Sequence, residues 1–190
     1  SHKKMQQLKA IGQRIEEVMQ ASRTPAAGGM SLKGAVQSIF EAPVVMGDEY
    51  LMTPKLHGTS WAPVPPNLRW GCDAKLADEI CNFNRDAAEE SGYFESTRFL
   101  QEEQPSDGEQ VVFCDSNTSK VLFSAPKGRT FRDFVEESRK HGWPSFRDAE
   151  VNWDVVRVLP NGETVSVHGT HLGHNLPDGS GNRYCINLVS

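Results

Sequence analysis

The sequence is poor in cysteine, and its four cysteines never stand close together. They occupy positions 72, 81, 114 and 185, without a Cys-x-x-Cys pair. Small secreted domains that depend on disulfides contain cysteine at a much higher density. The spacing therefore favours separate thiols in a reducing compartment, either the cytoplasm or an organelle, over a disulfide framework.

The sequence also lacks long apolar runs and an excess of positive charge. A membrane helix needs roughly 20 apolar residues in a row, and the chain contains no such run, so we expect no membrane partner. The formal net charge is -5, and the lysines and arginines are scattered. Because nucleic-acid-binding domains usually carry a basic patch, we expect no nucleic-acid partner either.

The apolar content is sufficient for one core. Hydrophobic residues make up 37% of the 190 residues, which is enough for one hydrophobic core and therefore predicts a single domain. We expect a monomer.

Helical periodicity is confined to the first half of the chain. Apolar residues recur at helical spacing over residues 3–22 and again over residues 32–40. Residues 42–71 contain several prolines and no clear period, which predicts an extended segment lying over the core. Apolar positions from Leu76 onward predict a third helix, which should end near Ser91.

The second half of the chain has the pattern of strands. Hairpins are expected over residues 109–123 and 153–168, the latter around an Asn-Gly dipeptide, which is the strongest short hairpin signal. Residues 183–189 supply a last strand. Thr130 and Asp133 form a capping signal for a short helix between the hairpins. The fold is therefore predicted to be mainly β (α+β), with N-terminal helices packed on a mostly antiparallel β core.

Cys185 is the leading candidate for a reactive side chain. It lies two residues after Arg183 and shortly after a histidine-rich stretch. Positive charge favours the nucleophilic thiolate form of cysteine, and histidine can transfer protons at neutral pH. The alternative is an inert cysteine buried in a terminal strand.

His168, His171 and His174 recur at every third position. The glycines among them, Gly169 and Gly173, favour a loop over a helix. Three imidazoles with a nearby thiolate would suit zinc, copper or iron, so a histidine-based metalloenzyme is one hypothesis. A second hypothesis is that one or two of the histidines act as proton donors for Cys185. A third is that they only form hydrogen bonds to backbone carbonyls.

Asp178 and Trp143 complete the set of candidates. Asp178 lies between the histidines and Cys185 and can orient a histidine, although an aspartate in Pro-Asp-Gly is often a turn residue. Trp143 precedes a proline and so begins an extended or turn segment. Its ring is either a wall for an apolar or partly cationic ligand group or an ordinary core aromatic.

Three motifs lie in the second half of the chain: Gly142-Trp143-Pro144-Ser145-Phe146, His171-Leu172-Gly173-His174 and Arg183-Tyr184-Cys185-Ile186-Asn187. Together they resemble the type B methionine sulfoxide reductases, which reduce the R epimer of methionine sulfoxide. The resemblance covers roughly residues 88–190, and it implies a core of two packed antiparallel sheets. It assigns residues 72–190 to a catalytic domain and residues 1–71 to a helical and extended N-terminal segment packing on it. The three motifs stand in the same order as in that family.

The resemblance implies an oxidoreductase of protein repair under oxidative stress, acting on methionine sulfoxide in peptides or proteins. Cys185 would attack the sulfoxide and become a sulfenic acid. The histidines and Asp178 would position water and a proton, and Arg183 and Asn187 would hold the site around the thiol. The implied catalytic residues are Cys185, His174, His171, Asp178, Arg183 and Asn187, and the implied substrate-binding residues are Trp143 and Phe146.

The family's structural zinc should be missing. Its ligands are two Cys-x-x-Cys pairs, and here the corresponding positions are Cys114 with Asn117 and Val165 with His168. With one thiol in place of four, we expect no metal and no other cofactor, and packing should hold the hairpins instead.

The family's recycling cysteine is also replaced, by His141. Cys81, Cys72 and Cys114 are the candidates for a substitute, with Cys81 favoured because its helix precedes the segment that should approach the site. The resulting disulfide would be reduced by thioredoxin or another dithiol. Direct reduction of Cys185 by an external reductant is the other route.

A non-catalytic binding module on the same β scaffold is the main alternative function. It would hold a methylated or apolar group against Trp143. Such a module needs only an aromatic wall, and the additional cysteine, histidines, arginine and asparagine therefore favour the enzyme.

Overall fold

The computed structural model describes residues 44–190, which form short helices around two β-sheets. The predicted helices over residues 3–22 and 32–40 lie outside the described residues. The helices are η1 (Glu49–Met52), η2 (Arg69–Gly71), α3 (Ala74–Asp78), the π-helical turn η3 (Glu79–Phe83), α4 (Tyr93–Ser96), α5 (Phe99–Glu102), α6 (Phe131–His141) and η4 (Asp148–Glu150). The strands are β1 (Val111–Cys114), β2 (Val121–Ala125), β3 (Ser145–Phe146), β4 (Val156–Val158), β5 (Glu163–Ser166), β6 (His171–Asn175) and β7 (Tyr184–Ile186).

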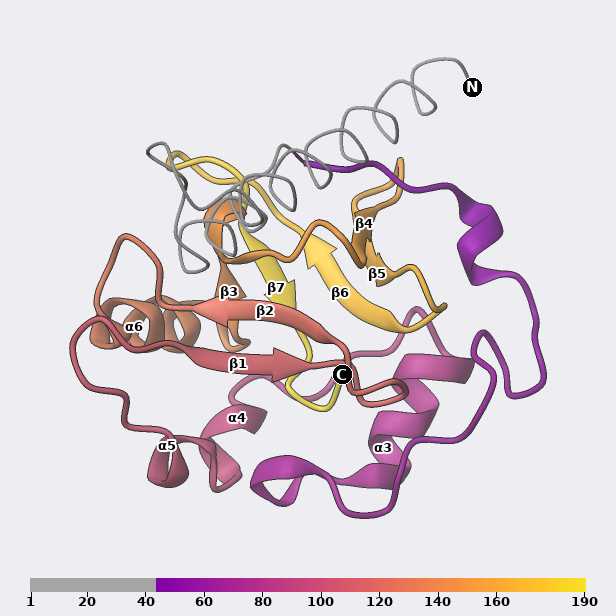
Figure 1. The fold of residues 1–190 in the computed structure, drawn as a ribbon, viewed down its shortest axis with the longest axis horizontal. Coiled ribbons are helices and arrows are strands. Elements are labelled where there is room, and N and C mark those ends of the chain that lie inside the picture. The colour runs from indigo at the N-terminus through magenta and orange to yellow at the C-terminus, as the bar shows by residue number, and fades with distance from the viewer. Residues whose placement is uncertain (1–43) are drawn as a thin grey trace, which may run out of the picture.

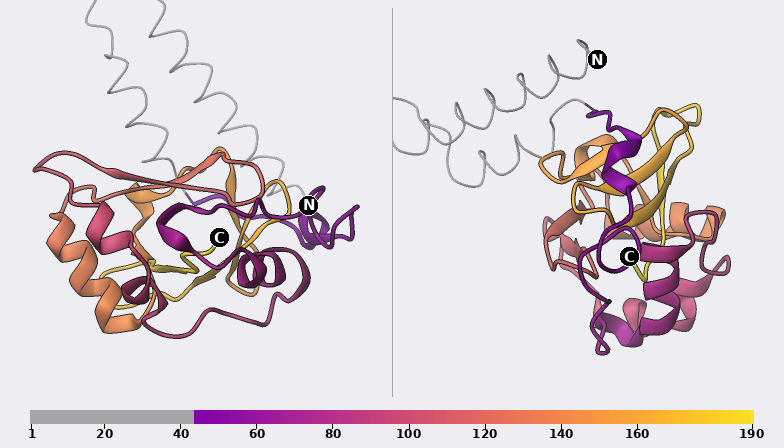
Figure 2. Two further views of the ribbon diagram at one scale, coloured as in Figure 1. Left: turned by 90° about the horizontal axis from the view of Figure 1, so that it is seen from below. Right: turned by 90° about the vertical axis from the view of Figure 1, so that its right-hand side faces the viewer.

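Both sheets are antiparallel, as predicted. β1 and β2 form a two-stranded hairpin, and the other strands form a five-stranded sheet in the order β3-β7-β6-β5-β4. The β4–β5 hairpin and the last strand, β7, also confirm the sequence prediction. Figures 1 and 2 show the β1–β2 hairpin lying across the larger sheet, with α6 and α3 at opposite ends of the molecule.

Aromatic side chains join the two sheets. The rings of Phe123 on β2 and Phe146 on β3 are stacked, with centroids 4.3 Å apart and planes inclined by 11°. Phe113 on β1 contacts Phe146 edge-on at 4.9 Å, and Phe134 of α6 lies against both. Each such pair contributes about 0.5–1.5 kcal/mol beyond the burial of its apolar area. Phe146 is fully buried in this cluster.

Helix α6 begins and ends as its sequence indicates. Thr130 and Asp133 form a reciprocal capping box, which confirms the predicted helix start. Gly142 ends the helix at a φ of 92°, in the left-handed region that favours glycine. The chain therefore turns sharply after His141, and Trp143 emerges beside the large sheet.

The helix expected from Leu76 to Ser91 is shorter than predicted. After α3 and η3 the N–H of Asn84 bonds to the carbonyl of Glu79 and its backbone leaves the helical region, which ends the helix. Phe83, the last residue of η3, is 58% exposed. The chain from residue 84 instead continues as an irregular segment.

The described part of the N-terminal segment packs on the core. Val45, Val64 and Trp70 belong to the same buried cluster as the sheet residues, which agrees with an extended segment over the core. The boundary between residues 71 and 72 stays a prediction. No helix among residues 44–190 has the length and apolar content to cross a membrane.

Candidate active site

Cys185 lies in a pocket of about 430 Å³ between β6, β7, the end of α6 and residues 85–88. The pocket has mainly apolar walls, which include Leu176 at its exposed side. The structure brings most of the predicted site residues together here. Those that line the pocket are Cys185, His171, His174, Arg183, Asn187 and Trp143.

Arg183 contacts the sulfur of Cys185 directly. Residues two apart in an extended chain lie on the same face, and the Nη1 of Arg183 donates a hydrogen bond of 3.0 Å to Sγ of Cys185. The Arg183 side chain is 9% exposed. The contact therefore places a positive charge directly against the Cys185 sulfur, where little water competes with it.

A β-bulge places His171 and His174 on the same side of β6. The expectation of a loop here is wrong, because His171–Asn175 is a strand paired with both β5 and β7. Val165 is opposite His171 and Thr164 is opposite Gly173, so Leu172 is an extra residue. The bulge shifts the two-residue alternation of the strand, and the two imidazole rings lie 5.9 Å apart.

Gly173 has a different role from the predicted one. A Cβ at this position would lie 1.9 Å from the carbonyl oxygen of Cys185. The glycine therefore permits the close approach of β6 and β7, whereas Gly169, at a φ of 90°, does lie in the turn before β6.

Glu163 orients His171. Its Oε1 lies 2.9 Å from Nδ1 of His171, and its carboxylate also accepts hydrogen bonds from Arg85. Burial disfavours the charged carboxylate, but the bonds from His171 and Arg85 prevail and lower the pKa of Glu163 to about 2. The contact occupies Nδ1, so Nε2 is the ring nitrogen of His171 that is left for another partner.

His174 is a neutral imidazole at neutral pH. Burial, and then the neighbouring His171, lower the pKa of His174 below its ordinary value. It is half-buried and pairs in register with Cys185 across β6 and β7. A neutral ring offers one N–H donor and one acceptor next to the sulfur.

The indole of Trp143 is held by the segment before α4. Its Nε1 donates a hydrogen bond of 3.1 Å to the carbonyl oxygen of Glu89. The N–H of Glu89 donates to Oδ1 of Asn187, and the Glu89 carboxylate accepts the backbone N–H groups of Leu188 and Val189. Glu89 thus joins the Trp143 ring to the residues that directly follow β7, the strand of Cys185.

Asn187 lies in the pocket as expected, whereas Asp178 lies outside it. Asn187 lines the pocket, but its amide also donates to the carbonyl oxygen of Leu172 and so fixes β7 to β6. Asp178 does not line the pocket and binds both terminal nitrogens of Arg147 at 2.9 Å. Hydrogen bonds from Arg147 and the Ser180 backbone hold the pKa of Asp178 well below its ordinary value.

Phe146 does not reach the pocket either, and the strand geometry explains why. Ser145 is opposite Cys185 and Phe146 is opposite Tyr184. Cross-strand partners share a face and neighbours alternate, so Phe146 points to the core when Cys185 points to the pocket. The prediction that Phe146 contacts the substrate is at odds with its full burial.

The structure places none of the three candidate recycling thiols in the Cys185 pocket. Cys81 is fully buried, and burial raises its pKa to about 12. Cys72 is also buried, and burial, then Glu89, raise its pKa to about 12. Cys114 is half-buried and lines a second pocket together with Cys72. All the cysteines are free thiols.

Hydrogen bonds connect the turn after β1 to the residue before β6. The Asn117 amide donates to the Thr170 hydroxyl at 2.9 Å and to Oδ1 of Asn82 at 2.8 Å. The Thr170 hydroxyl donates to the buried carboxylate of Asp115. This polar network joins the β1–β2 turn to the start of β6 and adds to the aromatic packing between the two sheets.

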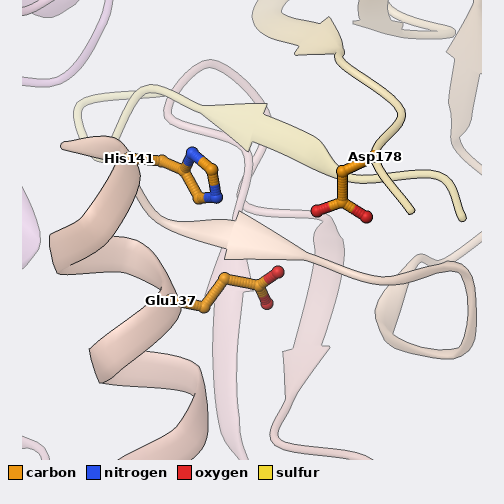
Figure 3. A group of neighbouring side chains, drawn as sticks. All are labelled: Glu137, His141 and Asp178. Atoms are coloured by element: carbon orange, nitrogen blue, oxygen red, sulfur yellow. The ribbon is translucent and has the colours of Figure 1, made fainter. Parts of the chain in front are cut away.

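The histidines do not form a metal site within the described residues. His168, His171 and His174 are not gathered as ligands, and the group of possible ligands found among residues 44–190 is Glu137, His141 and Asp178. Figure 3 shows these three side chains converging from α6 and from the loop before β7.

The carboxylates of that group are already paired. Glu137 and Asp178 both bind the guanidinium of Arg147, and Glu137 also binds Arg129. A cation there would have to displace two arginines, so the arrangement is an ion-pair network rather than a metal site.

Sequence reasoning missed several residues of this site. Arg85 and Glu163 are 78 positions apart, and only the fold brings them to His171. Glu89 is a buried acidic residue without a motif, and no local pattern in the sequence indicates a role for His141. A buried charge in the middle of an irregular segment is the signal that could have drawn attention to Glu89.

Comparisons with known proteins return no relative. No family model matches the chain, and neither a curated protein nor a solved structure is significantly similar to it.

Proposed function

We propose that this protein is a thiol-dependent methionine-R-sulfoxide reductase with Cys185 as its nucleophile. The observation that carries the proposal is the 3.0 Å contact between Arg183 and the Cys185 sulfur inside a pocket with apolar walls. Sulfoxide reduction needs a soft nucleophile at sulfur and a proton source at oxygen. Cys185 and the paired histidines supply these two requirements side by side.

In the first step the Cys185 thiolate attacks the sulfoxide sulfur and takes over its oxygen. The S–O bond of the substrate breaks, the oxygen receives a proton, and methionine leaves as the thioether. The substrate sulfur is reduced by two electrons, and the Cys185 sulfur is oxidised by two electrons to a sulfenic acid.

The surrounding residues position the reactants. Neutral His174 and the free nitrogen of His171, oriented by Glu163, hold water and a proton at the sulfoxide oxygen. The Trp143 ring, fixed by its bond to Glu89, forms a wall against the S-methyl group. The pocket thus binds the methyl group of the substrate against Trp143 and the sulfoxide oxygen next to the two histidines.

The second half of the cycle must remove the oxygen from Cys185. Because Cys72, Cys81 and Cys114 lie outside the pocket, direct attack by an external thiol on the Cys185 sulfenic acid is the route that the geometry supports best. A dithiol reductant such as thioredoxin can perform both thiol exchanges in sequence.

The test is a reduction assay with the two epimers of a methionine sulfoxide peptide and dithiothreitol. We expect turnover of the R epimer alone, with the S epimer as the internal control, and no turnover by Cys185→Ser. Equal reduction of both epimers, or full activity of Cys185→Ser, would refute the proposal. Binding of the sulfoxide peptide without any reduction would favour the non-catalytic binding module instead.

A further inference from the structure

His141 is brought into the Cys185 pocket by the way in which α6 ends. It is the last residue of the helix, and Gly142 then turns the chain so that Trp143 also faces the pocket. A Cβ on Gly142 would lie 2.0 Å from Oγ of Ser91, so the turn is tightly fixed against the segment before α4. The histidine therefore has a defined position, and the oxygen-transfer step described above leaves it without a role.

The charges that surround His141 come from three parts of the chain. Its own helix supplies Lys140 and Glu137, the loop before β7 supplies Asp178, and Arg183 approaches from the start of β7. One ring nitrogen lies within 4.8 Å of a carboxylate oxygen of both Glu137 and Asp178 (Figure 3).

The imidazole of His141 is free to accept a proton. Burial is the largest effect and Arg183 the next, and together they lower the pKa of His141 despite the two carboxylates. The carboxylates are held by Arg147, which limits their attraction for a proton on the ring. The pocket thus contains both a neutral base and the Cys185 sulfur.

We propose that His141 is the general base that deprotonates the external thiol during regeneration of Cys185. This inference rests on the proposed function and concerns its second half. A thiol that enters this pocket meets no second described cysteine, and it is protonated unless a base takes its proton. His141 is a base in the same pocket that the first half-reaction does not need.

The step is balanced as follows. His141 takes the proton of the external thiol while its sulfur attacks the sulfur of the Cys185 sulfenic acid, forming an S–S bond. The S–O bond breaks, and the leaving oxygen receives the proton from His141 and departs as water. A second thiol then attacks the external sulfur of this mixed disulfide, which releases the Cys185 thiolate and an oxidised disulfide.

The experiment separates the two half-reactions in the full chain. Enzyme without reductant is mixed with the R-sulfoxide peptide. The amounts of methionine peptide and of Cys185 sulfenic acid are measured, and one equivalent of each per enzyme is expected. Excess monothiol is then added, and the return of the Cys185 thiol is followed. The variants are His141→Asn and His141→Gln, and the matched control is His168→Asn, whose histidine lies outside the pocket.

We expect both His141 variants to form the sulfenic acid at the wild-type rate and to be regenerated about 100-fold more slowly, the range of a lost general base. The control should behave as the wild type in both steps. Thiols of low pKa, which are already ionised, should restore most of the regeneration rate, since they need no base. A purely structural defect would slow acidic and ordinary thiols alike.

Three outcomes would overturn the inference. In the first, both variants regenerate Cys185 at the wild-type rate. In the second, regeneration is slowed equally for thiols of low and of ordinary pKa. In the third, neither variant forms the sulfenic acid. Failure of the proposed function looks different, because then the wild-type protein itself would release no methionine peptide in the first step.

Discussion

The Nδ1 atom of His171 lies 2.9 Å from Oε1 of Glu163, and both side chains are almost completely buried. The Glu163 carboxylate fixes the orientation of the His171 ring and leaves Nε2 without this partner. A hydrogen bond to one ring nitrogen commonly orients a histidine in this way. Arg85 shares the same carboxylate, so the contact belongs to a buried network at the base of the pocket.

Replacing Glu163 by glutamine should destabilise the protein in a pH-dependent way. Its pKa is about 2 in the folded state, below the ordinary value of about 4.3, so its contribution is fully present above that value and is lost as the pH falls toward 2. At neutral pH we expect a loss on the order of 2–3 kcal/mol in the free energy of unfolding. Denaturant unfolding at pH 7 and pH 3 measures it, and an equal loss at both pH values would contradict this assignment.

Removing the Arg183 guanidinium should make Cys185 less reactive. In Arg183→Met the sulfur loses its charge-assisted hydrogen bond, and we expect alkylation by iodoacetamide at neutral pH to slow about tenfold. Arg183→Lys should retain part of the rate because a positive charge remains. Cys114 is as partly exposed as Cys185, so Cys185→Ser supplies the background to subtract. An unchanged rate in Arg183→Met would contradict the role of the contact.

The two functions of the Trp143 side chain can be separated by substitution. Trp143→Ala removes the pocket wall, and we expect KM for the sulfoxide peptide to rise about tenfold, the equivalent of about 1.4 kcal/mol of binding. Trp143→Phe keeps an aromatic face but loses the bond to Glu89 and should raise KM less. Steady-state kinetics decides, and equal effects of both variants would show that the hydrogen bond matters more than the wall.

The cysteines outside the pocket should be dispensable for turnover with a monothiol. Cys72→Ala, Cys81→Ala and Cys114→Ala each keep the Cys185 pocket intact, so we expect turnover numbers close to that of the wild type. Assays with a monothiol and with a dithiol protein reductant test this. A variant that stops after one turnover would identify the missing cysteine as a recycling thiol.

Gly173→Ala should destabilise the large sheet. The added Cβ would lie 1.9 Å from the Cys185 carbonyl oxygen, so β6 and β7 would have to separate. Overpacking of this kind costs typically 1–3 kcal/mol. Gly179→Ala is the matched control, because open space surrounds that position. Thermal unfolding compares the two, and similar melting temperatures would contradict the close approach of the strands.

Local sequence signals determined much of the fold. The Thr130 and Asp133 capping box predicts α6, and the Asn-Gly turn predicts the β4–β5 hairpin, because both signals act between residues a few positions apart. The contact between Arg183 and Cys185 could also be predicted from their spacing, since a strand places residues two apart on the same face.

Tertiary structure alone decided which candidates share a pocket. An extra residue in β6 brings His171 and His174 together, and the alternation of β3 sends Phe146 into the core. Arg85, Glu89 and His141 reach the site from distant positions. Their contacts depend on how strands and turns pack in three dimensions. Local sequence patterns do not indicate which residues far apart in the chain come into contact.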